Sequence, residues 1–334
     1  MSSGGPDGWR RDGEEGTAAW RRTAGAFAAA VVSGRLDVPL PGSGATRERW
    51  SVFADLAGED LSLARLGEGH ADAVAILAEL GGQRPDTGDR WAVWAANPPG
   101  ANVTAGRQGG AWVLRGTKQY CSGARVCTHA VVTAAADDGP RLFTVDVAGL
   151  DPVLGSWPAT GMAGSDTLDV SFPGVPAEPV GPPAGYTDRP GFSHGGVGVA
   201  ACWYGGARAV ARTLLHAAGK RDIGPHALAH LGAVDIGLRT ARDALRQAAD
   251  EIDADPADLR GRGPGRALRV RTLTEAVATE VLARTGRALG AGPLSHDEAH
   301  SRAVADLTVY LRQHHAERDL ARLGEMVAGD GADW

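Results

Sequence analysis

The segment GVGVAACWYGGARAVARTLLHAAGK, residues 196–220, carries apolar residues at helical spacing. One stripe of apolar and small residues recurs every three or four positions: Val199, Trp203, Gly206, Val210 and Leu214. Residues at this spacing lie along one face of an α-helix. The segment therefore predicts a long helix that buries one side against other helices.

Three further helical patterns follow, and clusters of Gly and Pro at 221–225, 260–265 and 290–293 separate them. Four long amphipathic helices joined by short breaks predict a four-helix bundle over residues 191–334. The fourth helix is expected at 302–322. The remaining stripes consist of Leu228, Leu231, Asp235, Leu238, Ala241, Leu245 and Ala248; of Val270, Leu273, Val277 and Val281; and of Val304, Leu307 and Leu311, continued by His314 and His315.

Residues 88–190 have a different pattern, with short β-rich runs between Gly, Pro and Asp. Leu168, Val170 and Phe172 alternate as one face of a strand does, and Gly residues in the segment 108–110 indicate a hairpin turn. This region predicts a β-domain of five to seven strands.

The chain before the β-domain is rich in Ala and Leu, which predicts an N-terminal helical domain over residues 17–87. Its clearest helix has a stripe of apolar residues that ends before Gly81, a typical helix stop. Residues 1–16 are polar and rich in Gly, and we expect them to be disordered. The fold class is therefore α+β and mainly α, with helices, then a β-domain, then a bundle.

Composition excludes several kinds of partner. The 334 residues carry a net charge of −6 and no long basic run, so nucleic acid is not expected. No apolar run is long enough for a membrane span, and the N-terminus lacks the apolar core of a signal peptide. Three cysteines without zinc-type spacing favour a reducing compartment, so a cytoplasmic protein is expected.

Four segments, in this order along the chain, resemble motifs of the acyl-CoA dehydrogenase superfamily of flavoproteins. GTKQYCSGA (116–124) resembles the segment at the flavin ring, and residues 161–181 resemble the end of the β-domain near the same ring. KRDIG (220–224) and GRALGAG (286–292) resemble a break after the first bundle helix and a Gly-rich stretch before the last helix. The resemblance implies FAD as cofactor and a dimer or tetramer that assembles through the bundle.

The resemblance also implies residues at the flavin ring. Ser122 would donate a hydrogen bond near N5 of the flavin, and Tyr120 would stack on the ring edge. Ser165 belongs to the second segment near the ring. The alternative is that Ser122 and Tyr120 belong to an ordinary β-turn.

A second set of residues would bind the phosphates of a cofactor that crosses between subunits. Arg221 would pair with a phosphate, and Gly286, Gly290 and Gly292 would let the backbone approach a pyrophosphate closely. His230 lies where the family has a Gln that contacts the partner's cofactor. The alternatives are a surface Arg and a plain turn between helices. His226 and His230 are spaced like metal ligands but have no third ligand, so no metal is expected.

The catalytic position departs from the family. In the dehydrogenases a Glu removes the α-proton of an acyl thioester, and counting from Asp306 puts His314 at that position. The helix 196–220 contains no Asp or Glu either, and Glu317 is a second candidate base. His314 is equally compatible with a histidine that is bonded to a carbonyl in the core. The resemblance implies that AANPPGANVTA (95–105) replaces a family stretch that touches flavin and substrate, with Asn97 and Pro98 as its remnants.

The sequence therefore predicts a flavin-dependent oxidoreductase that oxidises an acyl thioester, such as an acyl-CoA or a carrier-bound acyl group, or a similar CH–CH substrate. One alternative is a flavin-dependent monooxygenase or oxidase on the same fold. The protein partner of such a flavin enzyme would be an electron-transfer protein or a flavin reductase. Another alternative is a degenerate member that binds an acyl-CoA or a protein without catalysis.

Overall fold

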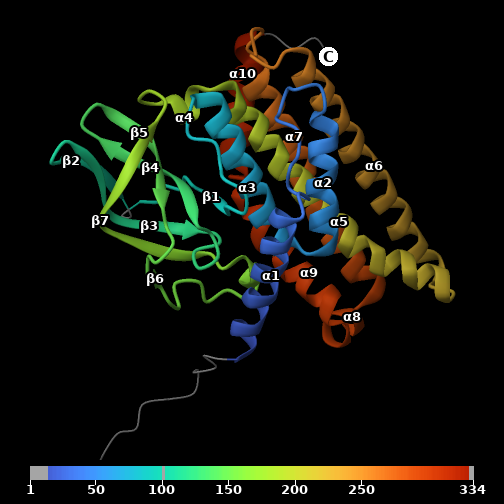
Figure 1. The fold of residues 1–334 in the computed structure, drawn as a ribbon. Helices are drawn as coiled ribbons and strands as arrows, with labels where there is room; N and C mark the ends of the chain where they lie inside the picture. Colours follow the sequence, from blue (N-terminus) through green and yellow to red (C-terminus); the bar gives the residue numbers. More distant parts are fainter. Residues whose placement is uncertain (1–13, 100–101, 331–334) are drawn as a thin grey trace, which may run out of the picture.

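The computed structural model describes residues 14–99 and 102–330, and its elements follow the predicted order of helices, sheet and longer helices (Figure 1). The predicted fold class is confirmed. The elements are α1 (Glu14–Val32), α2 (Thr46–Glu59), α3 (Leu61–Leu80), β1 (Trp91–Trp94), β2 (Val103–Gln108), β3 (Ala111–Cys121), β4 (His129–Ala136), β5 (Gly139–Asp146), β6 (Pro152–Val153), β7 (Leu168–Val180), α4 (Gly185–Asp188), α5 (Pro190–Lys220), α6 (Gly224–Ala254), α7 (Gly263–Leu289), α8 (Gly292–His296), α9 (Glu298–Tyr310) and α10 (Glu317–Asp330), with short 3₁₀ turns at Ala163–Ser165 and Leu311–Gln313.

The N-terminal helices have the expected start and stop signals. Asp60 caps α3 by accepting a 2.9 Å hydrogen bond from the backbone N–H of Leu63. Gly81 ends the helix in the left-handed conformation, with φ of 73°. Of the segment 1–16 that we expected to be disordered, residues 1–13 lie outside the described residues, and 14–16 form the first turn of α1.

The sheet of the described residues has seven strands, in agreement with the expected five to seven. β5 pairs with both β4 and β7, so the strand order β4-β2-β3-β7-β5 closes on itself as a small barrel. The hairpin predicted at 108–110 joins β2 to β3, and Gly109 and Gly110 both have positive φ there. The interior is filled by Trp94, Leu114, Phe143 and Phe172.

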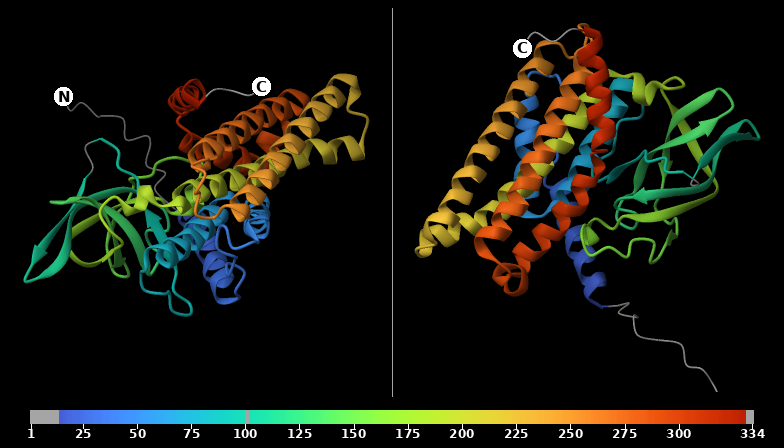
Figure 2. Two further views of the ribbon diagram at one scale, coloured as in Figure 1. Left: turned by 90° about the horizontal axis from the view of Figure 1, so that it is seen from above. Right: turned by 180° about the vertical axis from the view of Figure 1, so that it is seen from behind.

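Helix α3 joins the sheet to the bundle. Views from two directions show the sheet on one side of α3 and the long helices on the other (Figure 2). Ile76 and Leu77 of α3 pack with Trp91 of β1 and Leu142 of β5 in a small buried cluster. The sheet is thus fixed to the helical part through α3. A site with residues from both the sheet and the helices would therefore have a fixed geometry.

Helices α5, α6, α7 and α9 form the bundle, and α2 lies against α5 where Gly205 lets the helices approach. The prediction of one continuous helix over 302–322 is wrong. Helix α9 ends at Tyr310, the chain tightens into a 3₁₀ turn, and His314 has extended backbone before α10 begins at Glu317. The helix ends there, but Leu307, Leu311 and His314 all remain buried, and the His314 side chain is bonded to Thr272 of α7.

The stripe expected on α6 is only partly correct. Its second half, with Ala241, Leu245 and Ala248, is buried, whereas Leu228 and Asp235 in the first half are exposed. Among the helices of residues 14–99 and 102–330, none covers this side of the first half of α6 (Figure 1). No helix among the described residues has the length and apolar character needed to cross a membrane.

Candidate functional site

A chain of three buried hydroxyls connects strand β3 to the loop before β7. Ser122 Oγ lies 2.9 Å from Thr167 Oγ1, which lies 2.8 Å from Ser165 Oγ. Ser165 donates its proton to the carbonyl oxygen of Met162 at 2.7 Å. Since each hydroxyl has one proton, Thr167 donates to Ser165 and Ser122 donates to Thr167. This direction leaves the Ser122 oxygen as a hydrogen-bond acceptor, whereas the sequence led us to expect a donor.

Tyr120 lies two residues before Ser122 and presents its ring to solvent. Its side chain is 51% exposed, and its backbone has φ of 60°, which is uncommon for a residue with a Cβ. The ring meets Trp157 edge to face, with centroids 6.3 Å apart. We call Tyr120 and Trp157 the aromatic wall; an exposed aromatic face such as that of Tyr120 can stack on a flat ligand ring.

The loop that carries Ser165 is fixed on its other side by an ion pair. Asp166 accepts hydrogen bonds from the backbone N–H of Arg125 at 2.9 Å and from Arg125 Nε at 2.8 Å. The Arg125 guanidinium lies 3.9 Å from the ring centroid of Trp20 on α1. The hydroxyl chain is therefore held on a rigid support, as a binding wall should be.

A buried lysine fixes the strands next to this wall. Lys118 Nζ donates to Asn97 Oδ1 at 2.7 Å and to the carbonyl and hydroxyl oxygens of Thr133 at 2.8 Å each. Burial lowers the pKa of Lys118 to about 8. Asn97, which the sequence suggested as a motif remnant, thus links the chain after β1 to Lys118 on β3.

A buried group of charges on α3 was not predicted. Glu68 is paired with Arg65 at 2.6 Å, and Asp72 accepts from Arg49 at 2.8 Å. Burial raises the pKa of Glu68 to about 7, in spite of the neighbouring Arg65. Perturbed carboxyl groups are common at functional sites. The sequence signal was a Glu three residues after an Arg on the stretch of α3 whose neighbouring residues are mostly apolar or small.

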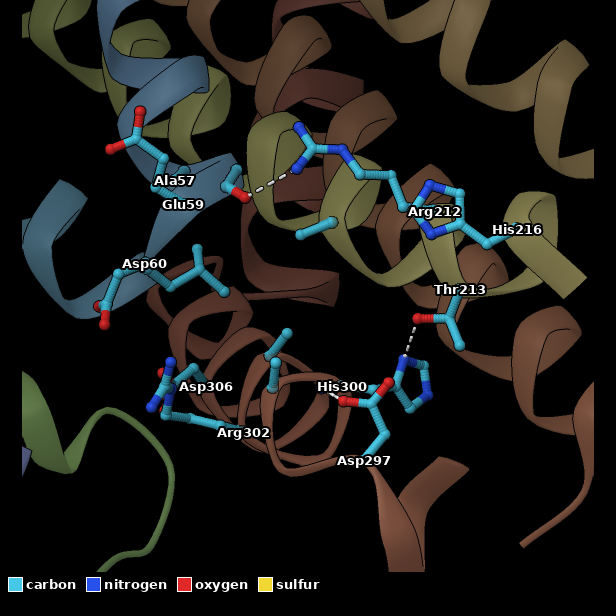
Figure 3. A pocket seen from close by; sticks show the side chains of 15 residues that line it. Ala57, Glu59, Asp60, Arg212, Thr213, His216, Asp297, His300, Arg302 and Asp306 are labelled. Atoms are coloured by element: carbon cyan, nitrogen blue, oxygen red, sulfur yellow. Dashed lines mark hydrogen bonds between the residues drawn. The ribbon is translucent and has the colours of Figure 1, made fainter. Parts of the chain in front are cut away.

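The open spaces at these residues are small. Ser122 and Arg65 line a cavity of about 10 Å³ between α3 and the sheet, room for about one water. A larger pocket of about 210 Å³ lies where the α2–α3 junction meets α5 and α9 (Figure 3). Ligand sites usually have about 300–1,000 Å³. Neither of these two spaces is large enough to enclose a flavin ring.

The larger pocket has polar walls. Arg212 donates to the carbonyl oxygen of Gly58 at 3.1 Å, and His300 is bonded to Thr213 at 2.9 Å (Figure 3). Burial raises the pKa of Asp306, which also lines the pocket, to about 6. None of the cofactor residues predicted from the sequence lines this pocket.

The residues predicted to bind phosphate lie at one end of the bundle. Arg221 is exposed at the end of α5, and Gly286, Gly290 and Gly292 lie at the end of α7 and the start of α8. His230 on α6 has its Nδ1 3.4 Å from Arg284 Nη1 of α7. Antiparallel packing brings the end of α5, the start of α6 and the end of α7 together. In a single chain, the predicted phosphate-binding residues at these ends face solvent.

The candidate catalytic residues lie at the turn between α9 and α10. His314 is buried, and both of its ring nitrogens have partners: Ala316 N–H donates to Nδ1 at 3.1 Å, and Nε2 lies 2.9 Å from Thr272 Oγ1. Burial lowers the pKa of His314, which keeps the ring neutral. Glu317 is exposed in the first turn of α10. The structure therefore places the predicted site residues at three locations: the aromatic wall, the bundle end and this turn.

Comparison with known proteins gives a fold but no close relative. No model of a known protein family matches the chain, and no curated protein matches its sequence. FkbI, a protein for biosynthesis of the methoxymalonyl extender unit of FK520, superposes with a TM-score of 0.77 at 15% identity, over 95% of this chain and 96% of its own. KijD3 in complex with FMN and a dTDP-linked amino sugar gives 0.70 at 19% identity, over 97% and 96%.

The dibenzothiophene monooxygenase TdsC from Paenibacillus sp. A11-2, in complex with FMN and indole, gives a TM-score of 0.70 at 18% identity, over 92% of this chain and 96% of its own. These structures span nearly the whole length of the chain. The chain therefore has the acyl-CoA dehydrogenase-like fold that its sequence motifs predicted. At identities below 20% the comparison establishes the fold, and function has to be argued from the site.

Proposed function

We propose that the protein is a flavin-dependent oxidoreductase whose flavin ring lies against Tyr120 and the hydroxyl chain of Ser122, Thr167 and Ser165. The observation that carries this proposal is the pairing of a half-exposed aromatic ring with buried hydroxyls on a rigid strand end. KijD3 and TdsC, which share the fold, hold FMN. FMN is therefore the first flavin to test, with the predicted FAD as the comparison.

The bound flavin would supply two-electron redox chemistry, and the chain's own residues would orient it. Ser122, as an acceptor, suits flavin N5 in the reduced state, because N5 carries a proton only after reduction. Tyr120 would cover one face of the ring, and Trp157 would limit its sideways movement. This role for Ser122 follows from the direction of the hydroxyl chain.

Between the two reactions predicted, the oxygen-using alternative has more support. Oxidation of an acyl thioester needs a carboxylate base, whereas His314 has both ring nitrogens bonded within the chain and Glu317 points to solvent. Helix α5 also lacks Asp and Glu. We therefore favour a monooxygenase or oxidase, and TdsC is a monooxygenase of the same fold.

We also propose that a second copy of the chain covers the flavin. Arg221, His230 and the Gly residues at the end of α7 face solvent at one bundle end, and Leu228 and Ile236 of α6 are exposed nearby. A dimer or tetramer through α6 would bury these apolar residues and bring the bundle end of one copy to the flavin of another. Light scattering on the purified protein tests this: a monomer at micromolar concentration would contradict it.

The experiment for the function is a titration of the purified protein with FMN and, separately, with FAD, followed by flavin absorption and fluorescence. We expect micromolar or tighter binding of one flavin and a perturbed visible band. Ser122→Ala should weaken binding of the anaerobically reduced flavin about fivefold, because it removes the acceptor for the N5 proton, and should change binding of the oxidised flavin less. Ser171→Ala, which removes an exposed hydroxyl on strand β7, is the control and should not change binding.

A protein that binds neither flavin would contradict the proposal and favour the non-catalytic alternative. Two experiments separate the reaction types: the bound flavin is reduced without oxygen and then mixed with oxygen, and the oxidised flavoprotein is mixed, without oxygen, with a set of acyl-CoA compounds. Fast reoxidation by oxygen supports the monooxygenase or oxidase. Bleaching of the oxidised flavin by an acyl-CoA would instead support the dehydrogenase.

A further inference from the structure

Asp306 on α9 is one half of a contact between the bundle and the β-domain that the proposed function does not yet use. Its side chain is 3% exposed, and Oδ1 accepts a 2.5 Å hydrogen bond from the backbone N–H of Met162. The two residues are 144 positions apart in the chain. A hydrogen bond to a carboxylate is stronger than one between neutral groups, so this contact is a firm attachment.

The backbone around Met162 is pressed directly onto α9. A side chain at Gly161 would collide with the carbonyl oxygen of Ala305 and would come within 2.6 Å of Val309 Cγ2. Met162 itself has φ of 58°, a conformation that a residue with a Cβ keeps only when its surroundings hold it there. The loop therefore depends on α9 for its shape.

The carbonyl oxygens of Gly161 and Met162 also hold two side chains of the proposed flavin site. Trp157 Nε1 donates to the carbonyl oxygen of Gly161 at 3.1 Å, which fixes the ring that meets Tyr120. Ser165 donates to the carbonyl oxygen of Met162 at 2.7 Å, which is the last bond of the hydroxyl chain. A shift of the Met162 peptide would thus move both the aromatic wall and the hydroxyl chain.

We propose that Asp306 is a positioning residue that holds the loop 157–167 on α9 and thereby sets Trp157 and Ser165 against Tyr120 and Ser122. This inference rests on the proposed function, because the wall that it describes is the proposed flavin wall. Asp306 does not touch the flavin. Its carboxylate acts through the Met162 peptide.

The variants separate the hydrogen bond from the charge. Asp306→Ala removes the acceptor, whereas Asp306→Asn keeps an acceptor oxygen and removes the charge. Asp297→Ala is the control, because Asp297 caps the N-terminus of the same helix and also accepts a backbone N–H, from His300 at 3.0 Å. Gly161→Ala leaves Asp306 intact and pushes the loop away from α9.

Two readouts are needed. The first is amide hydrogen exchange of the peptide 157–168 in the flavin-free protein, and the second is the affinity for FMN. In Asp306→Ala we expect exchange in this peptide about tenfold faster and FMN binding about fivefold weaker, since a charge-assisted bond is lost. Asp306→Asn keeps an acceptor but loses the charge, so it should lie between the wild type and Asp306→Ala in both. Gly161→Ala should resemble Asp306→Ala, which keeps the test valid if Asp306→Ala does not fold.

Equal effects of Asp306→Ala and Asp297→Ala on both readouts would overturn the inference, because the loss would then reflect general stability. Normal FMN binding by Asp306→Ala with a mobile loop would also overturn it, while leaving the flavin function intact. A wild-type protein that binds no flavin would overturn the proposed function, and the exchange data would then reduce Asp306 to a structural contact.

Discussion

The imidazole of His314 is hydrogen-bonded to Thr272 on α7, with Nε2 2.9 Å from Oγ1. Because Ala316 N–H donates to Nδ1, the proton of the neutral ring is on Nε2 and points to Thr272. The ring also meets Trp203 of α5 edge to face, with centroids 6.4 Å apart. One side chain thus fastens the break between α9 and α10 to two helices of the bundle.

From this contact we expect His314→Ala to lower the free energy of unfolding by about 1–3 kcal/mol, because it leaves buried hydrogen-bonding groups without partners. Thr272→Val should cost less, and the double variant should cost less than the sum of the two. Urea denaturation of the four proteins measures this. The catalytic role predicted for His314 remains a separate prediction: a drop in turnover in His314→Ala with flavin still bound. Strictly additive stability losses would show that the bond contributes nothing.

Glu68 gives a prediction about pH. Burial raises its pKa to about 7 in the folded protein, against about 4.3 in an unfolded chain. The folded state therefore binds more protons between these values, and the contribution of Glu68 to stability is lost as pH rises from about 4.3 through about 7. The free energy of unfolding of Glu68→Gln should lack this decline. The difference between variant and wild type should change by up to about 1.4 kcal/mol per pH unit in that window.

Urea denaturation at several pH values from 4.5 to 8 measures the difference. Other titrating groups, including Asp306, are present in both proteins and cancel. The Arg65–Glu68 pair makes the absolute stability of Glu68→Gln hard to interpret, so the slope is the informative quantity. Parallel curves for the two proteins would contradict the raised pKa.

The periodicity of the sequence predicted α5, the second half of α6, and the hairpin between β2 and β3, because burial of a stripe and the turn at Gly109–Gly110 are local properties. It failed at His314. Nothing in the spacing of Leu307 and Leu311 signals that the helix stops at Tyr310, and spacing cannot reveal the bond that joins His314 to Thr272 on another helix.

In the candidate site, too, local features were predicted from the sequence and long-range contacts were not. Ser122 and Tyr120 could be named from a motif, because both belong to one short strand end. Thr167 and Asp306 were not recognised as candidates, because their importance lies in contacts with residues 45 and 144 positions away. The exposed first half of α6 was read as buried because an apolar stripe does not tell whether its partner is in the same chain.

Gly205 on α5 should be intolerant of any side chain. A Cβ there would collide with the carbonyl oxygen of Ala54 on α2 and with the Ala54 Cα at 2.8 Å. We expect Gly205→Ala to destabilise the protein by about 1–3 kcal/mol through overpacking. Gly219 is on the same helix with open space around it, so Gly219→Ala should be neutral or stabilising by up to about 1 kcal/mol. Thermal unfolding of both variants makes the comparison, and equal effects would show that α2 and α5 are less closely packed.

Tyr120 allows function and stability to be separated. Its φ of 60° strains a residue with a Cβ, whereas glycine adopts this conformation freely. Tyr120→Gly relieves the strain and loses the contact with Trp157, so its free energy of unfolding should stay within about 1 kcal/mol of the wild type. If the ring covers a flavin, FMN binding should weaken about fivefold, while Tyr120→Phe keeps the ring and the affinity. Parallel FMN titrations and melts test this. Unchanged FMN affinity in Tyr120→Gly would show that the aromatic ring does not contact the flavin and would remove Tyr120 from the proposed site.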